Sequence, residues 1–95
     1  MAVTVKFFAN FSEAAGKDQE IVDGVNDLAS LFEELSRRFG NNFVKQLYSQ
    51  KDRRLRETVH ILVNGKRIEV LHDLKTPLKY EDVVAIFPPV AGGKS

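Results

Sequence analysis

One amphipathic stripe limits what this chain can fold into. Apolar residues recur at helical spacing through the segment 28–39, so one face of a helix must be buried against the rest of the chain. Asn26 or Asp27 can cap the start of this helix, and Gly40 can end it in a left-handed conformation. The stripe consists of Leu28, Leu31, Phe32, Leu35 and Phe39.

Several segments outside the stripe have strand patterns or a second apolar helical face. Residues 3–8 alternate with a period of two, which predicts a first strand. Residues 19–22 predict a short second strand, joined to the first by a connection that includes residues 14–18. Phe43, Val44, Leu47 and Tyr48 indicate a second short helix.

The second half of the chain contains a hairpin signal. Asn64-Gly65 separates the apolar run 58–63 from the run 66–70, and a type I′ turn favours this dipeptide because both central residues need positive φ. Thr76-Pro77-Leu78 predicts a tight turn before a final strand over residues 82–87.

The order of these elements predicts an α+β fold of the ubiquitin-like β-grasp type, with a mixed sheet packed on one main helix. The first and last strands are expected to be adjacent. Residues 1–89 form the predicted β-grasp domain, and residues 90–95 a flexible C-terminal tail.

Composition excludes several classes of function. The 95 residues carry a net charge of +1, so no general field attracts nucleic acid or an anionic membrane, and neither is an expected partner. The chain has no cysteine, which removes disulfides and thiolate chemistry. Because there is no apolar run of membrane-spanning length and no signal-peptide pattern, a cytoplasmic location is expected.

The di-glycine Gly92-Gly93 near the end of the chain is the main functional signal. Glycine lacks a Cβ, so such a tail can lie extended in a narrow channel. The six residues 88–93 can reach roughly 20 Å, which is enough to enter a partner's pocket. Pro88 and Pro89 stiffen and aim this segment, and Gly92 gives it clearance.

The ending Phe87-Pro88-Pro89-Val90-Ala91-Gly92-Gly93 resembles the C-terminal signature of the MoaD family, within the ubiquitin-like MoaD/ThiS superfamily. MoaD is the sulfur-carrier small subunit of molybdopterin synthase. Residues 3–9 are similar to that family's first strand, and residues 63–65 to its hairpin.

The resemblance implies a carrier that is not an enzyme on its own. An E1-like enzyme would use ATP to adenylate the Gly93 carboxylate, and sulfur would then displace AMP to leave a thiocarboxylate. The large, MoaE-like subunit of molybdopterin synthase would use this sulfur on a pterin precursor of the molybdenum or tungsten cofactor. No cofactor or metal is expected on the chain itself.

The partner interface is expected at the start of the tail. If Val84 and Ile86 face the core, Val83, Ala85 and Phe87 face the other way. With Phe8 they would form an exposed apolar patch, to which Val90 adds; the alternative is that Phe87 only caps the core. The resemblance favours an interface, because the matching aromatic of the family docks on the large subunit.

The chain departs from the family pattern at two places. Glu81 stands where the family commonly has Gly, which implies a turn that needs no positive φ. Lys94-Ser95 turns the Gly93 carboxyl into an amide, which cannot be adenylated. Either a protease removes the two residues, or they are not native to the protein, or this member does not carry sulfur.

Two other functions remain open. The chain could be a ubiquitin-like modifier joined through Gly93 to lysines, or a structural subunit that transfers nothing. His60 and His72 lack further ligands at metal-binding spacing, so no zinc site is expected. The basic cluster at residues 51–56 is interpreted as a solvated loop that could also meet an acidic partner.

Overall fold

The computed structural model describes residues 2–88. Within this range five strands form one mixed sheet in the order β2-β1-β5-β3-β4. The parallel pairing of β1 with β5 places the first and last strands side by side, and the other pairs are antiparallel. This is the predicted β-grasp arrangement. The strands are β1 (Ala2–Phe7), β2 (Gln19–Asp23), β3 (His60–Val63), β4 (Lys66–Arg67) and β5 (Val83–Phe87).

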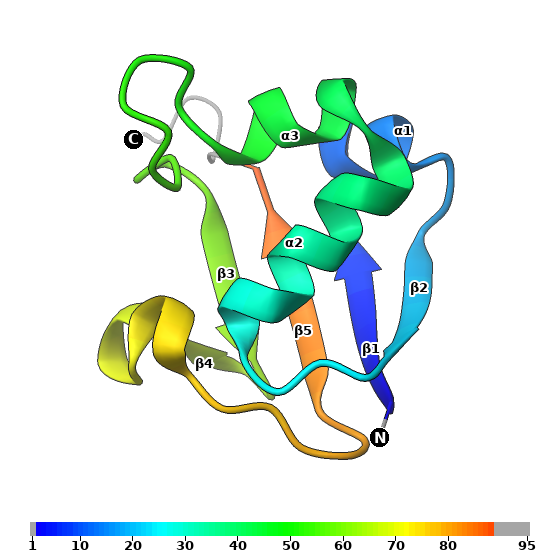
Figure 1. Cartoon of the computed structure of the whole chain (residues 1–95), viewed down its shortest axis with the longest axis vertical. Helices are drawn as coiled ribbons and strands as arrows, with labels where there is room; N and C mark the ends of the chain where they lie inside the picture. Colours follow the sequence, from blue (N-terminus) through cyan, green and yellow to red (C-terminus); the bar gives the residue numbers. More distant parts are fainter. Residues whose placement is uncertain (1, 89–95) are drawn as a thin grey trace.

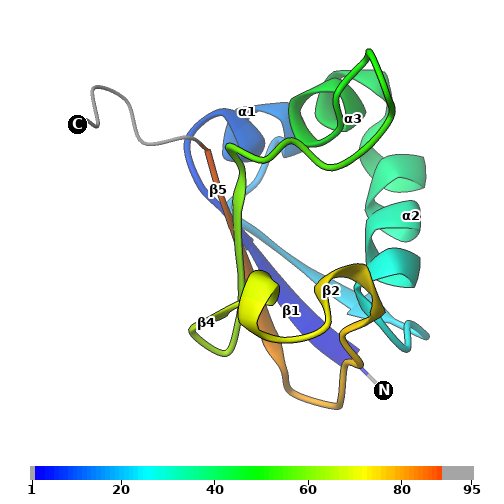
Figure 2. The same ribbon diagram turned by 90° about the vertical axis from the view of Figure 1, so that its left-hand side faces the viewer.

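The helices lie on one face of the sheet and leave the other face uncovered (Figures 1 and 2). The main helix α2 (Leu28–Phe39) crosses this face, and α3 (Asn41–Leu47) follows it directly. A third helix, α1 (Asn10–Ala15), connects β1 to β2. Two short 3₁₀ turns, η1 (Ile68–Val70) and η2 (Asp73–Lys75), lie between β4 and β5.

The core lies between α2 and the sheet. Leu28, Leu31, Phe32 and Leu35 are fully buried, as the helical stripe predicts, and Phe39 is partly buried. Across from them, alternate residues of β1 and β5 point inward, so Val84 and Ile86 are buried. Edge-to-face and tilted ring contacts, with centroids 5.4–5.8 Å apart, join β1 to the three helices through Phe7, Phe11, Phe39 and Phe43.

Both predicted ends of α2 are observed, one of them with a different geometry. Asp27 caps the start: its Oδ1 accepts a hydrogen bond from the Ser30 backbone N–H at 2.8 Å, and Ser30 Oγ accepts one from Asp27 N–H. Gly40 ends the helix at φ 81° and ψ −163°, which is not the left-handed helical conformation that was expected. The reason is that Gly40 ends α2 and begins α3 in the same step.

Two segments differ from their predicted structure. The connection after β1 contains α1, a helix whose only fully buried side chain is Phe11. The strand predicted over residues 66–70 ends at Arg67, because the chain turns there into η1 and Ile68 enters the core.

The segment before β5 also differs from prediction. Thr76-Pro77-Leu78 is extended beside the start of α2: Thr76 O accepts from Leu28 N–H at 3.1 Å, and Leu78 N–H donates to Asn26 O at 2.9 Å. The tight turn follows at residues 79–82, where Glu81 has φ 71°. The expectation that Glu81 avoids positive φ was therefore wrong.

Candidate functional site: the start of the C-terminal segment

Strand β5 carries the chain to the C-terminal segment. It occupies the middle of the sheet, between β1 and β3, and ends at Phe87. Pro88, which is half-buried, is the last residue described. The predicted site residues Pro89, Val90, Gly92 and Gly93 lie outside the described residues, as do Lys94 and Ser95.

The two aromatic residues predicted at this end of β5 lie together. Phe8 and Phe87 are stacked, with ring centroids 4.2 Å apart and planes 11° from parallel. Phe8 is 38% exposed and Phe87 is half-buried, so their rings stay partly open to solvent. Phe87 therefore packs on Phe8 outside the buried core cluster, and the prediction that it faces away from the core is confirmed.

A backbone turn directly after β1 places Phe8. Ala9 has φ 53° and ψ −121°, a conformation that L-residues seldom adopt. The Phe8 carbonyl accepts a hydrogen bond from Phe11 N–H at 3.1 Å, and the Ala9 carbonyl accepts one from Glu13 N–H at 3.1 Å, so α1 holds this turn. This turn could not be predicted from the sequence, because alanine is not a residue type that favours positive φ.

The strand registers place further apolar residues on the same face as the aromatic pair, with Thr4 and Lys6 of β1 among them. Thr4 is the Cα partner of both Ile21 and Val83, and Ala85 is the partner of Leu62, so these positions share the uncovered face of the sheet. Ile21 is 55% exposed. We call this surface the open-face patch; it consists of Phe8, Ile21, Leu62, Val83, Ala85 and Phe87.

Polar groups border the patch near Phe8. An open pocket of about 610 Å³ adjoins this ring, and Lys6, Glu13 and Asp18 help to line it. Ser12 Oγ donates a hydrogen bond to Asp18 Oδ1 at 2.6 Å, and both residues line this pocket. Lys6 is the Cα partner of Ala85 and therefore lies within the uncovered face, whereas Glu13 and Asp18 bring negative charge to the pocket beside Phe8.

The histidines do not form a metal centre. His60 is half-buried at the start of β3, where it is the Cα partner of Phe87. His72 is exposed just before η2. Among residues 2–88, no group of three or more His, Asp or Glu side chains could hold a metal ion. The helices of this range are likewise too short or too polar to span a bilayer.

The carboxyl groups with shifted pKa values include two in an ion-pair network between β2 and α2. Lys17 and Arg38 lower the pKa of Glu20, and Arg38 and Arg37 lower that of Glu34. Arg38 joins the two elements, with Nη1 2.8 Å from Glu20 Oε2 and Nε 2.8 Å from Glu34 Oε2. These groups link β2 to α2 at the edge of the sheet.

Comparison with known proteins identifies the family. The model of the ThiS family matches residues 5–93, which includes the di-glycine. The chain belongs to the ThiS family. Its relatives are small ubiquitin-like carriers or modifiers, and like them this chain is not itself an enzyme.

Three similar proteins illustrate the range of the family. Small archaeal modifier protein 3 of Haloferax volcanii is 28% identical, over 98% of this chain and 100% of that protein. The solution structure of small archaeal modifier protein 1 from Methanosarcina acetivorans has a TM-score of 0.82 and 33% identity, over 97% and 96% of the two chains. A structure from Pyrococcus furiosus assigned as molybdopterin converting factor, subunit 1, has a TM-score of 0.71 and 32% identity, over 95% and 99%.

Proposed function

We propose that this chain is a sulfur carrier, the small subunit of a molybdopterin synthase. The open-face patch supports this proposal, because it places exposed apolar surface where β5 leads into the segment that contains Gly92-Gly93. The ending Phe-Pro-Pro-Val-Ala-Gly-Gly and the similarity to the Pyrococcus furiosus protein favour the pterin pathway.

The chemistry takes place at the Gly93 carboxyl, once cleavage after Gly93 has freed it from Lys94. A carboxylate is a poor electrophile because an oxide would have to leave. Its oxygen attacks the α-phosphorus of ATP in an E1-like enzyme, and pyrophosphate leaves. The resulting acyl-adenylate has AMP as a stabilised leaving group. Hydrosulfide displaces it: a C–S bond replaces the C–O bond to AMP, and loss of the S–H proton leaves the thiocarboxylate.

The partner then receives this reactive end. In this proposal the MoaE-like large subunit contacts the open-face patch through Phe8, Phe87 and Val90, while Pro88 and Pro89 aim the tail. Gly92 and Gly93 lack side chains, so the thiocarboxylate can enter a narrow active site. The carrier contributes a surface and an acyl group, and it acts in the cytoplasm.

The mass of the protein recovered from its own cells tests this function. We expect loss of Lys94 and Ser95 and a gain of about 16 Da, because one oxygen is exchanged for sulfur. A variant ending at Gly92 is the matched control and should gain no sulfur. Retention of Lys94 and Ser95 in cells that sulfurate the pterin normally through this chain would contradict the proposal.

Protein modification is the second candidate function. The similarity to two small archaeal modifier proteins favours it. The same activated Gly93 would then form an isopeptide bond with a lysine of a target protein. Tryptic fragments of target proteins that carry residues 80–93 of this chain on a lysine, in place of a free thiocarboxylate, would support this function, because Lys79 is the last trypsin site before Gly93.

A further inference from the structure

The loop between α3 and β3 is ordered by its own hydrogen bonds. Ser49 N–H donates to Arg54 O at 2.8 Å, and Arg53 N–H donates to Ser49 O at 2.9 Å. Arg56 ties the end of the loop to α3: its Nε and Nη2 donate to Lys45 O at 3.1 and 3.0 Å. Tyr48 and Leu55 also form an isolated β-bridge. Side chains on this loop are therefore presented from a defined backbone.

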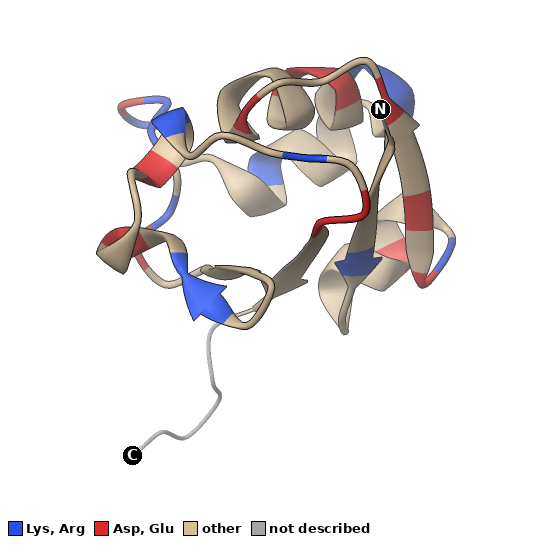
Figure 3. Cartoon of the chain, turned by 90° about the horizontal axis from the view of Figure 1, so that it is seen from below, with Lys and Arg blue, Asp and Glu red and all other residues tan. Residues whose placement is uncertain are grey.

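This loop concentrates positive charge that the rest of the chain lacks. Basic and acidic residues are mixed over the molecule (Figure 3). Residues 51–57 hold four basic and two acidic side chains, a net +2, while the whole chain carries +1. Within residues 2–88, the exposed side chains of Lys51, Arg53 and Arg54 form no ion pair. Their charges are available to a partner.

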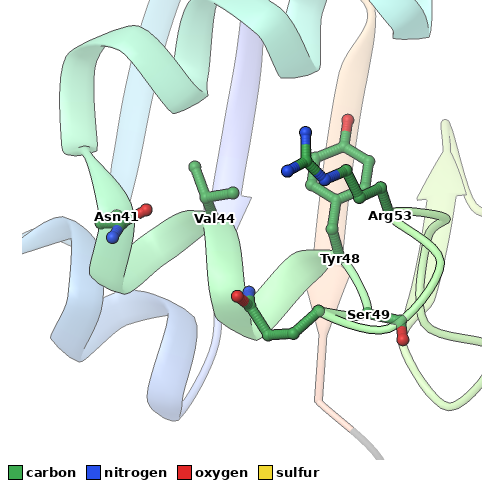
Figure 4. Close-up of a pocket in the computed structure, with 6 residues that line it drawn as sticks. Asn41, Val44, Tyr48, Ser49 and Arg53 are labelled. Atoms are coloured by element: carbon green, nitrogen blue, oxygen red, sulfur yellow. The ribbon is translucent and has the colours of Figure 1, made fainter.

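A pocket of about 410 Å³ lies between α3 and this loop. Figure 4 shows Arg53 extending from the loop toward α3, on the side of Tyr48. Most of the polar side chains around the pocket can donate hydrogen bonds. Burial and the nearby Glu33 carboxylate raise the pKa of Tyr48, so its phenol keeps its proton and can donate at neutral pH. The lining consists of Asn41, Val44, Tyr48, Ser49, Gln50 and Arg53.

The pocket and the loop lie at the functional end of the sheet. The loop leads into β3, whose first residue, His60, is the Cα partner of Phe87. Figure 1 shows the loop and the end of β5 at the same end of the molecule. A protein that handles the C-terminal segment can therefore reach this loop as well.

We propose that the basic loop and its pocket form a second docking surface, which binds a carboxylate-bearing surface of the enzyme that adenylates Gly93. This inference rests on the proposed function. Arginine forks and hydroxyl donors around a pocket suit a carboxylate side chain, and exposed cations speed association with an acidic partner. Nucleic acid fits less well, because three unpaired cations neutralise few phosphates and residues 51–57 include no aromatic residue for base stacking.

Charge reversal with a matched control tests this surface. The loop variant combines Lys51→Glu, Arg53→Glu and Arg54→Glu. The control combines Lys66→Glu, Lys75→Glu and Lys79→Glu, which are exposed, form no ion pair within residues 2–88 and change the net charge equally. Each is made in a chain ending at Gly93, and circular dichroism checks that each is folded. Binding to the E1-like enzyme of the same organism is measured by calorimetry, and ATP–pyrophosphate exchange is measured in the same samples.

We expect the loop variant to bind at least about tenfold more weakly than wild type at ~0.05 M salt, and the control to stay within about twofold. The difference in affinity between the loop variant and the control should be smaller at ~0.5 M salt, because salt screens exposed charges. Tyr48→Phe, which keeps the ring and removes the donor, should weaken binding about threefold.

Equal binding by the loop variant and the control would overturn the docking surface. If pyrophosphate exchange by the wild-type chain persists in that case, the adenylation of Gly93 that the proposed function requires is unaffected. If the wild-type protein neither binds the enzyme nor supports pyrophosphate exchange, both the docking surface and the proposed function are wrong. Binding of a labelled RNA that is lost only in the loop variant, with enzyme binding unchanged, would assign the loop to nucleic acid and refute the inference.

Discussion

Glu81 is held in a left-handed conformation by hydrogen bonds on both sides of the turn. Its N–H donates to Ala2 O at 2.9 Å, and the next N–H, of Asp82, donates to Lys79 O at 3.1 Å. The Asp82 carboxylate is fixed in turn by Asn64 Nδ2 at 2.9 Å and Lys79 N at 2.8 Å. The turn therefore cannot relax, although φ 71° is costly for a residue with a Cβ.

Glu81→Gly should therefore stabilise the protein. The left-handed conformation costs an L-residue about 1–2 kcal/mol, and the added flexibility of glycine in the unfolded chain takes back about 0.5–1 kcal/mol. The expected net gain is about 0.5–1 kcal/mol in the free energy of unfolding, measured by urea denaturation. Glu57→Gly is the control: Glu57 is exposed without positive φ, so glycine there should destabilise. Equal loss of stability in both variants would show that Glu81 carries no strain.

At the scale of elements, the cap of α2 links the start of the main helix to pH. The hydrogen bonds from the Ser30 backbone and hydroxyl lower the pKa of Asp27 below its ordinary value of 3.8. Because the folded-state pKa is the lower one, the charged cap stabilises the fold above pH 3.8. This contribution is lost as the pH falls through the folded-state pKa.

Asp27→Ala should lower the melting temperature by about 5 °C at pH 7, because the N–H of Ser30 loses its acceptor. In thermal scans, the difference in melting temperature between wild type and this variant should become smaller below pH 3.8. Asp27→Asn keeps an oxygen acceptor that does not titrate. The difference in melting temperature between this variant and Asp27→Ala should therefore not change with pH. If wild type keeps its full excess in melting temperature over Asp27→Ala down to about pH 2, the stability does not depend on the charge of Asp27 and the prediction is wrong.

How well each element could be predicted depends on the range of the interactions that form it. The stripe and cap of α2 are local in sequence, and both were predicted. Helix α1 has six residues and one buried side chain, which is too little periodicity to detect. Strand β4 ends early because Ile68 packs into a core built by distant segments. Isoleucine favours strands, so the local sequence predicted that the strand continues through Ile68.

The same distinction applies to the candidate site. Phe8 and Phe87 could be predicted together, because alternation and the expected adjacency of the first and last strands put both on one face. Ile21 and Leu62 join them only through the register of β2 and β3, which the sequence does not specify. The pocket beside Arg53 forms only because the loop after α3 folds back against that helix. The pattern of charges in the sequence does not predict this fold.

At the scale of the whole molecule, the two faces of the sheet differ. The helices cover one face and form the core with it, and the other face is free of helices. Figure 2 shows the helices on one side of the sheet only. Side chains under α2 are buried, whereas Phe8, Phe87 and Ile21 on the other face keep exposed surface. Stability and partner binding are thus carried by opposite faces of the same strands, and alternate residues of β5 belong to one or the other. Substitutions on the two faces should have separable effects.

Phe87→Ala provides the decisive test of this separation. Truncation removes an aromatic ring at the centre of the proposed interface, so binding to the MoaE-like large subunit should weaken by about 2 kcal/mol or more, measured by calorimetry. The free energy of unfolding should change less than the 3–5 kcal/mol typical of a Phe→Ala change in a core, because Phe87 packs outside the core cluster. Tyr80→Ala is the matched control, since Tyr80 is 64% exposed and lies in the turn before β5. Unchanged affinity of the Phe87 variant would remove Phe87 from the interface, and the open-face patch would then need another partner.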